Sequence, residues 1–105
     1  MRNPSASPQL GEQAATEKLP IRIETMDVDS DESVQQAFSR ILAQAPVDVL
    51  VNNAGIERVG PIEETPLADL RPCMEPNCVG AIRCSQGVVA PLRERWGWAR
   101  RAVTR

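Results

Sequence analysis

The 105-residue chain contains no histidine and no tyrosine, and Lys18 is its only lysine. The absence of histidine excludes histidine-based catalytic triads and histidine-ligated metal sites. The three cysteines, Cys73, Cys78 and Cys84, are an odd number without the paired spacing of zinc ligands. We therefore expect reduced thiols in a cytoplasmic protein, with neither a metal site nor a disulfide framework.

Long apolar runs, aromatic residues and a charge imbalance are also lacking. The sequence has no apolar run of 18 residues, 3% aromatic residues and a formal net charge of −2. Without such a run we expect no membrane span. We also expect no signal peptide, because residues 1–10 hold no apolar segment. The charge gives no general attraction to nucleic acid or membranes. At this length the chain is at most one small domain.

The apolar residues that are present predict an alternation of helices and strands. Ser7-Pro8 is typical of a helix start and predicts a helix over 8–18. Residues 21–28 alternate in part and predict a strand, and 31–45 predict an amphipathic helix. The β-branched run 47–51 predicts a strand buried on both faces, as in a parallel sheet. A loop over 60–64 and a long helix from Thr65-Pro66 to about residue 95 complete an α/β order.

The long helix carries prolines in its interior, among them Pro72 and Pro76. Each interior proline costs about 3 kcal/mol or kinks a helix. We therefore expect a kink, or a restart of the helix in two pieces with Pro76 at the head of the second.

The buried run ends in Val51-Asn52-Asn53-Ala54-Gly55, which places amides and small residues where open α/β sheets bind ligands. This segment resembles the signature of the short-chain dehydrogenase/reductase family, which binds NAD or NADP on a Rossmann sheet. A second match follows 24 residues after Asn53: Asn77, in Asn77-Cys78-Val79-Gly80, is similar to the asparagine that completes the family's catalytic tetrad.

The resemblance covers roughly residues 1–95 and implies an NAD(P)-dependent oxidoreductase that acts on a small-molecule alcohol or carbonyl. It implies that Asp27 and Val28 border the adenine. It implies that three residues present backbone to the cofactor: Asn53, Ala54 and Gly55. It also implies that Arg2 pairs with a 2′-phosphate and favours NADP. It also implies that Asn77 holds a water in a proton relay.

The departures from the family are equally informative. The family's glycine-rich turn, which holds the pyrophosphate, is absent, as are its catalytic serine, tyrosine and lysine. The resemblance implies a partial Rossmann fold that lacks the first two strands and the C-terminal half. Because those two strands lie between the third and the fourth, the two that remain would face a gap unless they pair or borrow strands from another chain. We therefore expect the isolated chain to be inactive.

Simpler interpretations of the site residues stay open. Asp27 could be a turn residue, and Asn52, Asn53 and Gly55 could be ordinary turn chemistry. Asn77 could be a capping residue and Arg2 a solvated charge.

Two further roles remain open for the chain as a whole. It could be a non-catalytic interaction fragment that forms a homo- or hetero-oligomer, with a full-length relative for instance, through the long helix. Residues 96–105 form a divergent basic tail with Trp96 and Trp98, which is either an unstructured end or a segment that binds nucleic acid.

Overall fold

The computed structural model describes residues 2–3, 5 and 8–96. The amphipathic helix expected after residue 30 is α2 (Asp31–Leu42). Ser30 caps this helix, because its Oγ accepts a hydrogen bond from the backbone N–H of Ser33 at 3.2 Å. Asp31 and Glu32 in the first turn and Arg40 in the last match the helix dipole. These local signals explain why the predicted helix begins where it does.

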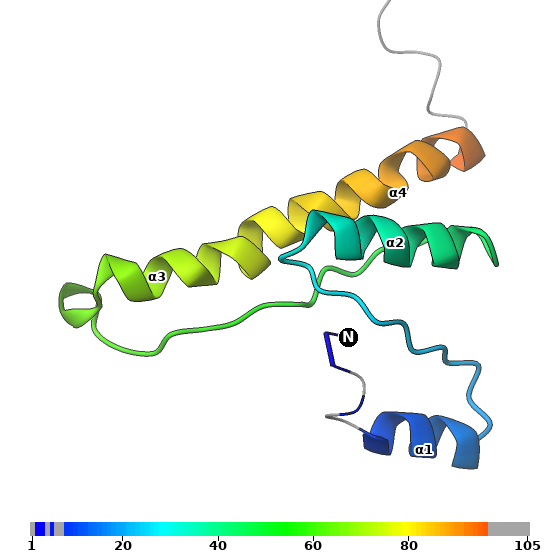
Figure 1. The fold of residues 1–105 in the computed structure, drawn as a ribbon, viewed down its shortest axis with the longest axis horizontal. Coiled ribbons are helices and arrows are strands. Elements are labelled where there is room, and N and C mark those ends of the chain that lie inside the picture. The colour runs from blue at the N-terminus through cyan, green and yellow to red at the C-terminus, as the bar shows by residue number, and fades with distance from the viewer. Residues whose placement is uncertain (1, 4, 6–7, 97–105) are drawn as a thin grey trace, which may run out of the picture.

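Helix α4 (Ala81–Trp96) packs along α2, and Figure 1 shows the two helices side by side. The contact is close at Gly87, where a Cβ atom would lie 2.6 Å from Cδ2 of Phe38. The buried core between the helices consists of four side chains: Val34, Phe38, Cys84 and Val88. Seven partly buried apolar residues surround it: Met26, Val28, Ile41, Leu42, Val47, Leu50 and Leu92.

The predicted long helix is interrupted rather than continuous. Helix α3 (Leu67–Met74) leads into a π-helical segment, η3 (Glu75–Gly80), and α4 follows directly. Pro72 lies inside α3 and Pro76 in the first turn of η3. Because a proline has no N–H to donate, a wider turn at this point relieves the clash that its ring would cause in an α-helix. The expected restart at Pro76 thus takes the form of a π turn.

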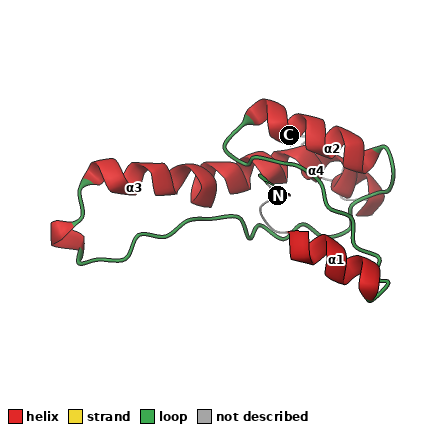
Figure 2. Ribbon diagram, turned by 60° about the horizontal axis from the view of Figure 1, so that its bottom comes forward, coloured by secondary structure: helices red, strands yellow, loops and turns green. Residues whose placement is uncertain are grey.

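The remaining helices are short. Helix α1 (Pro8–Thr16) ends two residues before the predicted boundary, where Lys18 adopts a left-handed φ of 52° and the N–H of Leu19 donates to the carbonyl of Ala14 at 2.9 Å. A short 3₁₀ helix, η2 (Ile62–Glu64), occupies the segment that we expected to be a loop. Helix α1 lies apart from the α2–α4 pair in both views (Figures 1 and 2).

The two predicted strands do not form within the described residues. Segments 21–28 and 47–51 run without regular secondary structure, and Figure 2 draws them as loops. The backbone hydrogen bonds of the described residues include none between these segments. A strand exists only through its ladder with a neighbour, so an apolar β-branched run without a partner stays irregular. The parallel sheet that the two runs predict does not form within the described residues.

The described part of the chain is loosely packed as a result. Its radius of gyration is 17.4 Å, against about 13 Å for a compact domain of about 100 residues. Val49 and Val51, which we expected to be buried, are each 76% exposed. No helix among the described residues is long and apolar enough to cross a membrane.

Candidate functional site

A pocket of about 330 Å³ opens where the end of segment 21–28 meets the loop that follows segment 47–51. Nine residues line it: Arg2, Met26, Asp27, Val28, Asp29, Ala54, Gly55, Ile56 and Pro76. They come from four separate parts of the chain. Five of the six predicted cofactor-binding residues are therefore neighbours around one cavity.

Asn53, the sixth, lines a smaller adjoining cavity of about 60 Å³ together with Val28 and Ala54. Val28 and Ala54 also belong to the larger pocket, so the six predicted residues line two adjoining cavities. Asn53, Ala54 and Gly55 are exposed, whereas Asp27 and Val28 are half-buried.

Asp27 is held in a tight turn at the edge of the pocket. Its backbone N–H donates to Oγ of Ser33 at 2.9 Å, and its Oδ1 accepts from the N–H of Asp29 at 3.2 Å. The carbonyl of Asp27 also accepts from the N–H of Ser30 at 3.2 Å. This is the turn chemistry that the sequence left open as an alternative, and it fixes the position of Asp27 before α2.

Asn77 lies in η3 and holds the opposite wall of the pocket. Its Oδ1 accepts from the N–H of Ile56 at 2.9 Å, and its Nδ2 donates to the carbonyl of Ile56 at 2.7 Å. Gly55 is required beside it, because a Cβ there would lie 2.6 Å from Oδ1 of Asn77. The Asn77 side chain thus tethers the Gly55–Ile56 backbone to the π turn.

Arg83 ties the first wall to the helices, and the sequence reasoning missed this. Its guanidinium donates to the carbonyl of Val28, to Asp31 and, at 2.9 Å, to Glu75. Its side chain is 16% exposed. The hydrogen bonds to Glu75 and then to Asp31 raise the pKa of Arg83 above its ordinary value, so the group stays charged.

Arg2 and the three cysteines are the other charged and thiol groups named from the sequence. Arg2 lies 3.9 Å from Asp29 across the pocket mouth, at the limit of an ion pair. Burial raises the pKa of the Cys84 thiol, and the nearby Arg83 charge opposes that shift. Cys73 is buried and Cys78 exposed, and no group of three or more potential metal ligands occurs in the described part of the chain.

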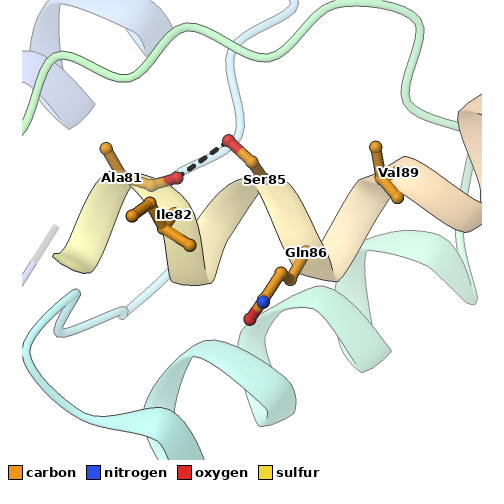
Figure 3. A pocket seen from close by; sticks show the side chains of 5 residues that line it. All are labelled: Ala81, Ile82, Ser85, Gln86 and Val89. Carbon is orange, nitrogen blue, oxygen red and sulfur yellow. Dashed lines mark hydrogen bonds between the residues drawn. The ribbon is translucent and has the colours of Figure 1, made fainter. Parts of the chain in front are cut away.

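A second surface lies along α4. A shallow depression of about 290 Å³ is lined by Ala81, Ile82, Ser85, Gln86 and Val89 (Figure 3). Oγ of Ser85 donates to the carbonyl of Ala81 at 2.8 Å and accepts from Asn52 at 3.3 Å. Asn52 thereby ties the 47–55 segment to α4. The residues that line the depression carry no charge, and three of the five are apolar.

The sequence and fold place this chain in a known family. A family model described as short chain dehydrogenase matches residues 1–98, and the chain belongs to this family of oxidoreductases. It is 43% identical over 86 residues to human "Retinol dehydrogenase 8", and the matched residues make up 80% of this chain and 27% of that protein. It is 35% identical over 98 residues to an uncharacterized oxidoreductase of Bacillus subtilis, YusZ, covering 91% of this chain and 35% of that one.

Solved structures of the family share the fold. A short-chain dehydrogenase from Streptomyces avermitilis matches 90% of this chain with a TM-score of 0.76 and 32% identity. A gluconate 5-dehydrogenase from Burkholderia cenocepacia, in complex with NADP and tartrate, matches 90% with a TM-score of 0.77 and 27% identity. The described helices and loops are thus a piece of the family's α/β Rossmann-type architecture. The chain spans about a third of the length of the relatives it matches.

Proposed function

We propose that this chain supplies the adenosine end of an NAD(P) site in a short-chain dehydrogenase/reductase. The observation that carries the proposal is the 330 Å³ pocket, which gathers Arg2, Asp27, Val28, Ala54 and Gly55 from three distant segments. A pocket of this size is at the lower end of the range of about 300–1,000 Å³ for small-molecule sites. It suits one half of a dinucleotide and not the whole.

The pocket's residues fit that half in their chemistry as well as in volume. Half-buried Val28 and the exposed Ala54 offer apolar contact to a flat ring, and the bare backbone at Gly55 permits close approach. Arg2 is the group that would pair with the 2′-phosphate of NADP. NAD lacks this phosphate and would bind without that contact, so the proposed cofactor is NADP or NAD. When bound, such a cofactor supplies or accepts a hydride at its nicotinamide. Asn77 acts here as a positioning residue, because its side-chain amide makes two hydrogen bonds to the backbone of Ile56.

The isolated chain, in this proposal, does not transfer hydride between an alcohol and a carbonyl. It holds no tyrosine to move the proton, and Lys18, its single lysine, lies just after α1 rather than beside the pocket. It also has no glycine-rich turn to hold a pyrophosphate. The proposal treats residues 1–95 as a cofactor-binding segment without the family's first two strands and C-terminal half, and residues 96–105 as a separate basic tail. It places the protein in the cytoplasm.

Titration with adenosine 5′-monophosphate, followed by amide chemical shifts, tests the site. We expect saturable shifts at residues 26–29 and 54–56, weak affinity and no oxidation of NADPH in the presence of carbonyl compounds. A Val28→Asp variant should lose the shifts, whereas Val59→Asp, at an exposed position outside the pocket, should keep them. Shifts spread evenly over the chain, or retained in Val28→Asp, would contradict the proposal.

A second candidate role, an oligomer formed through α4, is favoured by one observation. Three exposed apolar residues, Ile82, Val89 and Trp96, recur every seven positions and are 54%, 40% and 62% exposed. A seven-residue repeat keeps side chains on one helix face, as in paired helices. A homo-oligomer, or a hetero-oligomer with a full-length relative, would bury this stripe.

Size-exclusion chromatography of the chain, alone and with such a relative, tests the oligomer. Val89→Asp should abolish a larger species, whereas Ala90→Asp, an exposed neighbour off the stripe, should not. A monomer at all concentrations, with and without the relative, would rule this role out. Nucleic-acid binding by the tail concerns residues that, apart from Trp96, lie outside the described chain. It stays a prediction, tested by salt-dependent binding that is lost on removal of residues 93–105.

A further inference from the structure

The charges that line the pocket are unequal. One guanidinium, that of Arg2, faces two carboxylates, those of Asp27 and Asp29. Asp27 already accepts the N–H of Asp29 in its own turn. The carboxylate of Asp29 is the one paired with Arg2, with Nη1 and Oδ2 3.9 Å apart.

This pairing matters because, among the described residues, Arg2 is the only cationic one that lines the pocket. Its side chain is 70% exposed and can move, whereas the Asp29 side chain is 34% exposed and sits on a turn fixed by Asp27 and Ser30. A phosphate group bound by Arg2 would have to displace Asp29 and would then lie close to that carboxylate. Like charges at such distances repel, and the repulsion is less screened in a pocket than in open water.

We propose that Asp29 is a specificity-determining residue: it holds Arg2, opposes a 2′-phosphate and biases the pocket toward an adenosine ribose with free hydroxyls, as in NAD. This inference rests on the proposed function, since it concerns the ligand of the same pocket. Asp29 therefore offsets the preference for NADP that Arg2 alone would give.

Binding of two probes, adenosine 5′-monophosphate and adenosine 2′,5′-bisphosphate, tests the inference by calorimetry or chemical-shift titration at low salt. We expect the wild-type chain to bind the bisphosphate no more tightly than the monophosphate. In Asp29→Asn, the affinity ratio should shift toward the bisphosphate by about 1.4- to fivefold, the range expected when an exposed ion pair is released. In the double variant with Arg2→Met the ratio should return to the wild-type value.

A matched control separates the local effect from the change in net charge. Glu63→Gln alters the net charge equally but lies in η2, outside the pocket, and should leave the ratio unchanged. An unchanged ratio in Asp29→Asn, with both probes bound, overturns this inference and leaves the proposed function standing. An equal shift in Glu63→Gln overturns it as well, because the effect would then be general. Failure of the wild-type chain to bind either probe overturns both.

Discussion

Replacement of Asn77 should release one wall of the pocket without unfolding the helices. The amide of Asn77 makes two hydrogen bonds to Ile56, at 2.9 and 2.7 Å. Each is worth about 0.5–1.5 kcal/mol net, and the lower half of that range applies because the site is exposed. Asn77→Ala should therefore cost about 1–2 kcal/mol, which corresponds to about a five- to thirtyfold rise in opening of the loop.

Amide hydrogen exchange at Ile56 measures this directly. Exchange should speed up by that factor in Asn77→Ala, while core amides in α2 keep their protection. Asn77→Asp still accepts the N–H of Ile56 but cannot donate to its carbonyl, so its exchange rate should fall between those of wild type and alanine. Asn52→Ala, which removes the parallel tether to Ser85, should leave Ile56 unchanged.

The reasoning would be refuted by Ile56 exchange in Asn77→Ala that stays within about twofold of wild type. It would also fail if Asn52→Ala accelerated Ile56 as much as Asn77→Ala does. In that case the loop would open as part of a larger unit, and the Asn77 side chain would have no separate role in holding it.

Three further changes have defined outcomes. Gly55→Ala should accelerate Ile56 exchange by displacing the Asn77 amide, and should add little when Asn77 is already alanine. Phe38→Ala should cost about 3–5 kcal/mol, a large share of the about 5–15 kcal/mol typical of small domains, so the urea midpoint followed by helical circular dichroism should fall sharply. Iodoacetamide should modify exposed Cys78 faster than Cys84, whose burial raises its thiol pKa. Because the thiol of Cys84 ionises at lower pH in the unfolded chain, the stability of the fold should fall as pH rises above 9.0. Urea midpoints that stay unchanged across that pH would contradict this.

The helices were predictable because their signals are local. Ser30 as a cap, the acidic first turn of α2 and the spacing of Val34, Ala37 and Phe38 all lie within one short segment. The boundary errors, such as the two extra residues expected in α1, arise where the left-handed Lys18 ends the helix without a glycine. The interruption by Pro76 was foreseen, but the choice of a π turn over a kink was not.

The sequence alone could not tell whether the two strands form, because a strand needs a neighbouring strand to pair with. Runs 21–28 and 47–51 have the composition of strands, yet their backbone groups find no ladder within the described chain. The exposed valines at 49 and 51 show the consequence: with no second layer over them, one face of the run meets solvent. Composition therefore indicates what a segment can become, and the partner decides whether it does.

The motif resemblance singled out five of the nine residues that line the pocket, and their roles stay predictions. The residues that it did not single out include those with distant partners. Arg83 bonds the carbonyl of Val28, 55 residues away in sequence, and Asp31, 52 residues away. No spacing rule connects such positions. Ile56 and Asp29 were overlooked for a related reason: each adjoins a predicted residue, but its part in the pocket follows from the turn that it occupies.

The pocket keeps its shape without a sheet because its walls are tethered to the helices by side chains. Arg83 holds the carbonyl of Val28, Ser33 holds the N–H of Asp27, and Asn77 holds both backbone groups of Ile56. Each tether satisfies a backbone group close to the pocket, where a loop alone would leave it to water. The middle of run 47–51 has no such bond among the described residues. Order at the site therefore depends on η3, α2 and α4, so a variant that weakens the α2–α4 contact should loosen the pocket even though none of its own residues has changed.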